Sequence, residues 1–351
     1  MTGPATDHPG EPAGGPAEPG IPRSAAVVMW LLVGSAFVMI LNETIMSVAL
    51  PVLIADLGIS VGTAQWLTSG FLLTMAVVIP VTGFLLQRFA PRQIYIASMT
   101  LFSAGTLVAA LAPAPVLMTG RVVQAAGTAV MVPLLMTSLL RIIPPSRLGA
   151  TMGTITIVIA VAPAIGPTLS GVILTALGWR WMFWIVLPIA LIALTAGLLR
   201  LRITAETRPI PLDLLSVLLS ALAFGGLVFG LSSVGEQARG EALVTPWIPT
   251  AVGAVAMVVF VARQIRLQRT GAALLDLRPL TFRRFTVALT LVVLSMMSLF
   301  GVLILLPLYM QGVLHLDPFV TGSPCFPAGS RWACSARSSA ACTTGSARAR
   351  W

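Results

Sequence analysis

Nine long apolar runs dominate the sequence, and they constrain its fold more than any other feature. Each run has about 20 residues or more, the length that a helix needs to cross the hydrocarbon core of a membrane. Hydrophobic residues make up 57% of the chain and charged residues only 9%, too few to cover a water-facing surface. The sequence therefore predicts an all-α, polytopic membrane helix bundle. The predicted spans are residues 26–50, 64–87, 94–112, 115–140, 150–176, 181–200, 213–235, 246–264 and 286–310.

The charged and reactive side chains exclude several classes of function. The net charge is +10, but the arginines stand in short segments between apolar runs and form no basic domain that could bind nucleic acid. His8 and His315 lie far apart, and all three cysteines follow residue 324. Because no metal site or catalytic triad can be built from this set, we expect no enzyme, no metal and no cofactor.

The arginines also predict how the helices are oriented. If the N-terminus is cytoplasmic, fourteen arginines fall at the cytoplasmic side of the spans, and only Arg180 and Arg239 fall outside. Cytoplasmic loops of membrane proteins carry this excess of positive charge. We therefore expect a multi-pass protein of the cell membrane, with residues 1–25 as a disordered cytosolic tail rich in Pro and Gly.

A single carboxylate lies in the interior of these spans, away from their ends. Glu43 lies in the first run, within the segment Leu-Asn-Glu-Thr-Ile-Met-Ser-Val-Ala-Leu-Pro at residues 41–51. A charge at the centre of a membrane helix costs about 2.5–3.5 kcal/mol on insertion scales, so proteins that keep one usually use it for a proton, an ion or a substrate. The alternative is a structural acid that is hydrogen-bonded to another helix.

Two motifs in the fifth and sixth runs identify a family. Residues 166–171 read Gly-Pro-Thr-Leu-Ser-Gly, and residues 178–184 read Gly-Trp-Arg-Trp-Met-Phe-Trp. Together they resemble the major facilitator superfamily, specifically its fourteen-helix branch of drug:proton antiporters, the multidrug efflux permeases. The antiporter element of that family is Gly-x-x-x-Gly-Pro-x-x-Gly-Gly, which Gly166, Pro167 and Gly171 match.

This resemblance implies that the fifth span contributes to a moving helix seam. Ala162 and Ser170 stand where two glycines of the element would be. Small residues let two membrane helices approach closely, and we expect the fourth and fifth spans to form the seam. The alternative is an ordinary packing contact.

Two further positions are implied to handle protons. The segment that begins at Arg121 resembles the family's Arg-x-x-Gln-Gly element, with Gln124 one turn away and Ala125 in place of the glycine. A snorkelling arginine at the membrane interface is the alternative for Arg121. In the first span, Asn42 occupies the family's acidic position, and we interpret Glu43, about 100° further round the helix, as having taken over its role.

The loop between the second and third spans resembles the family's cytoplasmic latch, Gly-x-Leu-x-Asp-Arg-x-Gly-Arg-Arg. Gly83, Arg88 and Arg92 match it, whereas Gln87 replaces its acid and Ala90 replaces its second glycine. Since Gln87 cannot form a charge-assisted hydrogen bond, we expect a weakened latch.

The resemblance is expected to end near residue 322. Residues 323–351 contain no Leu, Ile, Val or Met, and a one-base shift of their codons is compatible with an apolar span that ends in a second latch motif. We predict a frameshift product there; a genuine hydrophilic tail is the alternative. The predicted organisation is a six-helix half at 26–201, a two-helix insert at 202–285 and the first helix of a second half at 286–322.

The function implied by the resemblance is efflux of lipophilic drugs or antibiotics across the cytoplasmic membrane, coupled to protons by antiport. The partners would be the lipid bilayer, a lipophilic small molecule and protons, with the proton gradient as the energy source. An inactive, truncated remnant of such a transporter is the alternative. Methionines such as Met46, Met75, Met131 and Met136 would either pack the core or line a plastic drug pocket. The sequence does not indicate the oligomeric state or the compound exported.

Overall fold

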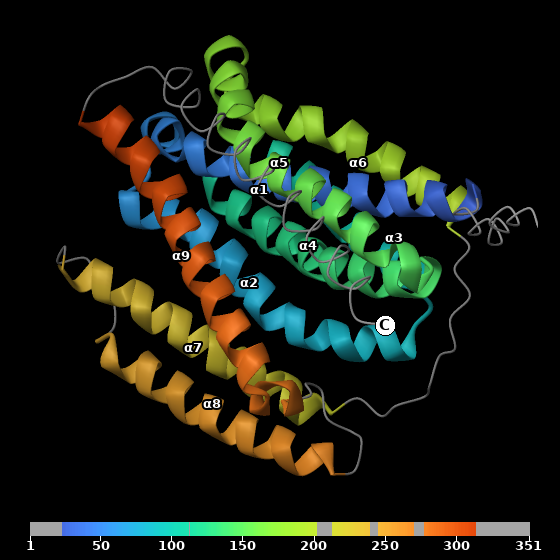
Figure 1. Cartoon of the computed structure of the whole chain (residues 1–351). Helices are drawn as coiled ribbons and strands as arrows, with labels where there is room; N and C mark the ends of the chain where they lie inside the picture. Colours follow the sequence, from blue (N-terminus) through green and yellow to red (C-terminus); the bar gives the residue numbers. More distant parts are fainter. Residues whose placement is uncertain (1–22, 112, 202–212, 239–244, 270–276, 314–351) are drawn as a thin grey trace, which may run out of the picture.

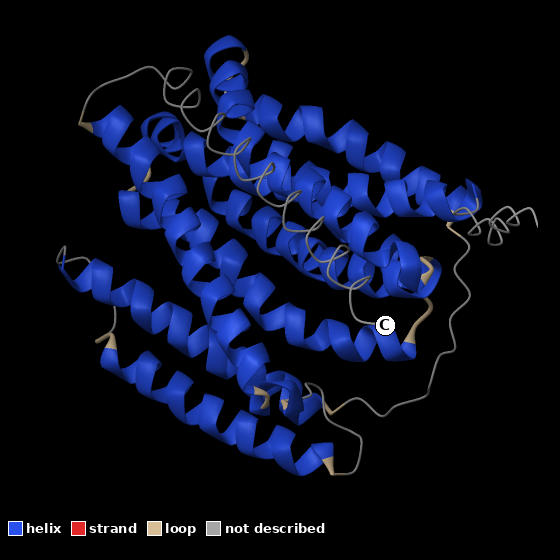
Figure 2. Ribbon diagram, in the orientation of Figure 1, coloured by secondary structure: helices blue, strands red, loops and turns tan. Residues whose placement is uncertain are grey.

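The computed structural model describes residues 23–111, 113–201, 213–238, 245–269 and 277–313, and within these ranges the chain is helical without strands (Figure 2). Eight of the helices are long and apolar enough to cross a membrane. Residues 1–22 of the predicted tail and 323–351 of the predicted frameshift product lie outside the described residues. The elements are α1 (Arg23–Leu57), α2 (Val61–Arg88), α3 (Pro91–Leu111), α4 (Ala114–Ile142), α5 (Pro145–Ala176), α6 (Arg180–Arg200), α7 (Leu214–Ala238), α8 (Trp247–Gln268), the short 3₁₀ helix η1 (Arg278–Thr281) and α9 (Arg283–Gly312).

Each predicted apolar run coincides with one of these long helices, but α1 is longer than predicted. It continues through Pro51 to Leu57, because a membrane helix tolerates a proline when neighbouring helices satisfy the freed carbonyl group. It ends before Gly58, whose φ of 62° is a left-handed conformation that glycine adopts readily. The extension adds an exposed second carboxylate, Asp56, to the last turn of the helix that carries Glu43.

Helices α1 to α6 form one packed bundle (Figure 1). The main contacts join α3 with α4, α2 with α4, α1 with α5 and α3 with α6. Two hydrophobic clusters fill the interior, one around Leu32 and Leu134, the other around Leu53, Leu117 and Phe183. Burial of these side chains against one another fixes which face of each helix points inward, and so places the polar residues described below.

Tyr95 connects three helices of this bundle. Its hydroxyl lies 2.8 Å from the Ser35 hydroxyl on α1 and donates to the Ala193 carbonyl on α6 at 2.9 Å. Its ring fits only because Gly197 has no side chain, since a Cβ there would collide with the ring.

Helices α7 and α8 form an antiparallel pair that contacts the bundle through α2. The two helices approach closely at Gly226 and Gly253, where a Cβ on either residue would meet the backbone of the other helix. Phe84 of α2 and Phe260 of α8 are buried against each other. Helix α9 differs from the rest: its described side chains are exposed or half-buried, and its main contacts are with η1 and α1.

Candidate functional site

A fully buried arginine lies at the centre of a polar network in the bundle. Arg121 is in the third turn of α4 and is only 1% exposed. Its Nη1 donates to the Gln124 Oε1 at 2.6 Å and to the Asn42 Oδ1 on α1 at 3.3 Å. This burial rules out a snorkelling arginine at the interface, because a snorkelling side chain keeps its charged group in water.

The network continues into two more helices. The Gln124 amide donates to the Thr106 hydroxyl on α3 at 2.8 Å, and Thr106 in turn donates to the Phe102 carbonyl at 2.6 Å. The Phe71 ring of α2 lies 4.2 Å from the Arg121 guanidinium carbon, a cation–π contact. The guanidinium is thus held by side chains from α1, α2 and α4, with α3 supporting Gln124.

Glycines at the contact of α3 and α4 make this network possible. A Cβ at Gly120 would come 2.9 Å from the backbone nitrogen of Ala109, and one at Gly105 would meet the backbone of Gln124. Because both positions lack a side chain, α3 lies close enough for Thr106 to reach Gln124.

Glu43 is adjacent to this network but does not belong to it. The side chain is half-buried, and among the described residues it forms no hydrogen bond and no ion pair within 4.0 Å. It interacts electrostatically with Arg121. The structure therefore does not support a structural acid that is hydrogen-bonded to another helix. Asn42 and Glu43 point in different directions, as their adjacent positions predict: Asn42 reaches Arg121, and Glu43 does not.

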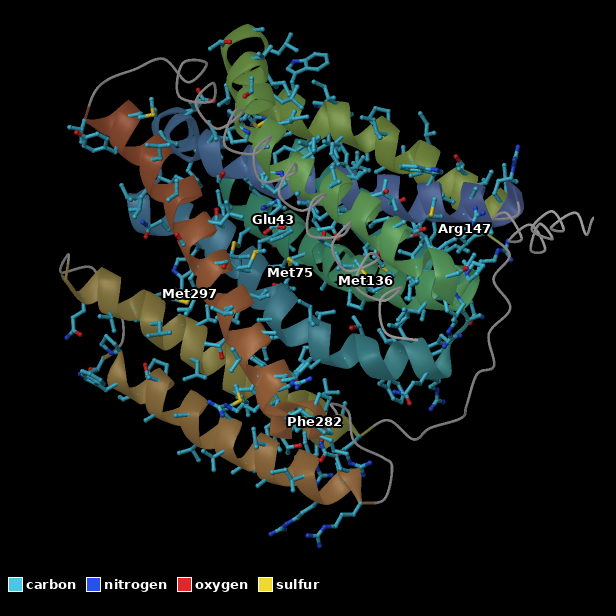
Figure 3. The ribbon with its side chains drawn as sticks, viewed as in Figure 1. Glu43, Met75, Met136, Arg147, Phe282 and Met297 are labelled. Atoms are coloured by element: carbon cyan, nitrogen blue, oxygen red, sulfur yellow. The ribbon has the colours of Figure 1, made fainter. Side chains whose placement is uncertain are left out.

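Only some of the methionines near Glu43 are core residues. Met46 and Met131 are buried in the two hydrophobic clusters. Met75 and Met136 are half-buried, and Figure 3 shows them with Glu43 near the middle of the bundle, across from Met297 of α9.

The predicted antiporter element packs directly beside Glu43. Gly166 lies against Thr44, and a Cβ at this glycine would collide with the threonine side chain. The Ser170 hydroxyl donates to the Ile45 carbonyl at 2.9 Å, and Pro167 and Gly171 are also buried.

The prediction that the fourth and fifth spans form the seam is wrong: the main partner of α5 is α1. The small residues in the sequence of α5 indicated that another helix packs closely against it, but not which helix.

The predicted latch has no acid, and its side chains bind within α2 and to α6. The Gln87 amide donates to the Gly83 carbonyl within α2 at 3.1 Å. The Arg88 guanidinium lies 5.8 Å from the Phe84 ring. Arg92 donates to the Leu198 carbonyl at 2.8 Å and so binds the C-terminal turn of α6.

Sequence analysis missed Phe71 and Thr106, the two other side chains of the network. No motif contains Phe71, and threonines in membrane helices commonly bond to their own backbone, so neither had a distinctive signal. No group of metal-ligating side chains occurs in the part of the chain that the structure describes.

The model of the Major Facilitator Superfamily matches residues 32–338. The chain belongs to this superfamily. It is 41% identical over 307 residues to an uncharacterized MFS-type transporter of Bacillus subtilis, covering 87% of this chain and 64% of the relative. It is 42% identical to the lincomycin resistance protein LmrB of Listeria monocytogenes, covering 91% of this chain and 66% of that protein. The chain thus spans about two thirds of the length of the curated relatives that it matches.

Solved structures agree on the fold. A crystal structure of a peptide transporter POT in complex with sulfate matches 84% of this chain with a TM-score of 0.58 at 16% identity, and 64% of that transporter is covered. The family match and the eight membrane-spanning helices together make the chain a multi-pass membrane protein of a transporter superfamily and not an enzyme. The superfamily match continues beyond residue 322, where we expected the resemblance to end, so residues 323–338 lie within it.

Proposed function

We propose that this chain forms part of a proton-coupled exporter that moves lipophilic drugs or antibiotics out of the cell by antiport. The observation that carries the proposal is Glu43. It is a half-buried carboxylate without a hydrogen-bond partner among the described residues, beside the fully buried charge of Arg121. An intramembrane carboxylate in this position is suited to exchange a proton.

Arg121 would stabilise Glu43 after the proton leaves. Its guanidinium is fixed by Asn42, Gln124 and Phe71, so its charge stays in place while Glu43 gains or loses a proton. A lipophilic compound, especially a cation, would then bind beside the ionised carboxylate, and a new proton would displace it. Met75 and Met136 offer flexible, polarizable surfaces to compounds of varied shape.

The contact between α1 and α5 would couple this exchange to movement. Ser170 holds the backbone of α1 at Ile45, two residues from Glu43, and Gly166 lies against Thr44. A shift of α5 would therefore displace the segment that carries the carboxylate. The N-terminus would be cytoplasmic, as the arginine distribution predicts.

The class of substrate is supported by the relatives. One that is 42% identical to this chain is named a lincomycin resistance protein. By analogy with it, we propose an antibiotic or a similar lipophilic compound as the substrate.

Transport into inverted membrane vesicles tests this function. Two proteins should be compared: the chain itself, and a fusion of residues 1–322 to the remaining part of the Listeria relative. We expect the fusion to accumulate lincomycin or a lipophilic dye when the vesicle interior is acidic, and to stop when an ionophore collapses the pH gradient. Gradient-independent accumulation by the fusion would contradict proton coupling. The same assay on the chain alone tests the alternative, an inactive remnant of a transporter. Such a remnant would insert into the membrane but would not transport the compound.

A further inference from the structure

A short turn joins α5 to α6 and contacts the end of α1. Residues 177–179 alone separate the two helices. Gly178 has a φ of 85°, a left-handed conformation that glycine adopts readily, and its N–H donates to the Ile173 carbonyl at 3.1 Å. The chain therefore reverses sharply, and Trp179 follows directly after the reversal.

Trp179 connects this turn to α1. Its indole N–H donates to the Asp56 Oδ2 at 2.7 Å. The side chain is only 3% exposed and belongs to the same hydrophobic cluster as Leu53 of α1 and Phe183 of α6. The Phe183 ring meets the indole edge to face at 6.4 Å, and the Arg180 guanidinium lies over the indole at 4.3 Å. The indole is thus held by its neighbours while its N–H binds α1.

Asp56 occupies a position where a carboxylate is unfavourable by itself. It is exposed in the last turn of α1, and that turn contains no basic residue. The C-terminal end of a helix carries a partial negative charge, which repels an acid. The hydrogen bond from Trp179 offsets this repulsion, so we infer that the carboxylate serves to hold α1 on the turn between α5 and α6.

Helix α1 is attached to α5 and α6 at two points, one on each side of a proline. The first is the bond from Ser170 to the Ile45 carbonyl, and the second is the bond from Trp179 to Asp56. Pro51 lies between them within α1. Because proline has no N–H, the helix lacks one of its internal hydrogen bonds there and is easier to bend.

We propose that Asp56 and Trp179 are positioning residues whose bond makes the terminal segment of α1, residues 52–57, move together with α5 and α6. Without this bond, the helix could bend at the proline, and a shift of α5 would reach Glu43 through Ser170 alone. With it, both sides of the proline follow the same shift. The attachment itself does not depend on what the protein transports; only its consequence for transport rests on the proposed function.

Hydrogen–deuterium exchange of the full chain in lipid nanodiscs, read by mass spectrometry, tests the attachment. Trp179→Phe keeps an aromatic ring but lacks the N–H donor. We expect it to exchange about tenfold faster in residues 52–57, as loss of a hydrogen bond to a charged group predicts, with little change in residues 28–41. Trp181→Phe, at an exposed tryptophan in the first turn of α6, is the matched control and should leave both segments unchanged.

Variants of Asp56 give a test in which the sign of the effect decides. If the carboxylate had no partner, Asp56→Ala would relieve the repulsion at the helix end and slow exchange in residues 52–57, after correction for intrinsic rates. The proposed bond predicts faster exchange instead. Asp56→Asn keeps an acceptor oxygen and should stay close to the unmodified protein. In a protein that already carries Trp179→Phe, Asp56→Ala should cause no further acceleration.

Three exchange results would overturn the attachment. These are unchanged exchange in Trp179→Phe, slower exchange in Asp56→Ala, or equal acceleration by Trp181→Phe.

Transport by the fusion described above tests the consequence. Trp179→Phe should reduce the maximal rate and leave the substrate concentration for half-maximal transport unchanged. An unchanged maximal rate, in a variant whose terminal segment exchanges faster, would overturn the positioning role. If the unmodified fusion does not transport, the proposed function fails, and the exchange measurements still decide whether Trp179 holds α1.

Discussion

Arg121 of α4 donates a hydrogen bond to Asn42 of α1, and in doing so it reaches the residue next to Glu43 without bonding to Glu43 itself. A neutral amide thus holds the guanidinium, while the carboxylate interacts with it only electrostatically. In the proposed mechanism this arrangement separates two tasks: Asn42 would keep Arg121 in position, and Glu43 would bind the proton or the cation.

Replacement of Arg121 by alanine should destabilise the bundle and reduce transport. Asn42 and Gln124 would each lose a buried partner, at a cost of about 1–3 kcal/mol for each unsatisfied group. Arg88→Ala is the matched control, because Arg88 is exposed and its removal should change stability by no more than about 0.5 kcal/mol. Thermal unfolding in detergent and transport per folded protein measure the two effects. If Arg88→Ala impairs transport as much as Arg121→Ala does, the loop around Arg88 still acts as a cytoplasmic latch that controls transport.

The helices were predictable from the sequence, whereas the pairing of polar side chains across helices was not. Twenty-residue apolar runs specify membrane helices by length alone, which is why eight of the predicted runs coincide with helices able to span a membrane. These helices are apolar on most of their faces, so the sequence did not reveal that α5 meets α1. Asn42 and Arg121 are 79 positions apart. A family motif indicated each of them, but nothing in the sequence indicated that they touch.

Replacement of Gly166 by alanine should separate α5 from α1. The new methyl group would collide with Thr44, a β-branched side chain with little freedom to move away. Overpacking of this kind typically costs about 1–3 kcal/mol. Gly34→Ala, also in a membrane helix, is the control: its Cβ would meet no atom within 4 Å, and alanine favours a helix by about 1 kcal/mol. The temperature of thermal unfolding should therefore fall for Gly166→Ala and stay level or rise for Gly34→Ala. An unchanged unfolding temperature in Gly166→Ala would show that α5 and α1 can move apart to accept the methyl group at little cost.

Replacement of Glu43 by glutamine should abolish the coupling of protons to substrate without loss of folded protein. Glutamine keeps the size of the side chain but cannot bind or release a proton. Substrate added to the solubilised fusion described above should release protons into weakly buffered solution, and Glu43→Gln should release none. Glu43→Asp keeps a titratable group and should retain part of the signal. Normal proton release by Glu43→Gln would assign the coupling to another residue.

Asp213 should make the contact between α7 and α8 sensitive to acid. Its two oxygens accept hydrogen bonds from Arg263 at 2.9 and 3.0 Å, and the Ser216 hydroxyl donates to it at 2.6 Å. The hydrogen bond from Arg263 holds the pKa of the Asp213 carboxyl below its ordinary value of 3.8. Because the folded pKa is lowered, the pair stabilises the fold at every pH above the ordinary value, and that contribution disappears as the pH falls through the folded pKa.

We therefore expect Asp213→Asn to be less stable than the unmodified protein at pH 7, by about 0.2–1 kcal/mol, the range for a solvent-accessible pair. The difference should persist down to about pH 4 and shrink below it, as the carboxyl of the unmodified protein becomes protonated. Thermal unfolding of both proteins between pH 3 and pH 7 measures the difference directly. A difference that stays constant below pH 3.5 would mean that Asp213 stabilises the start of α7 through Ser216 alone, without its charge.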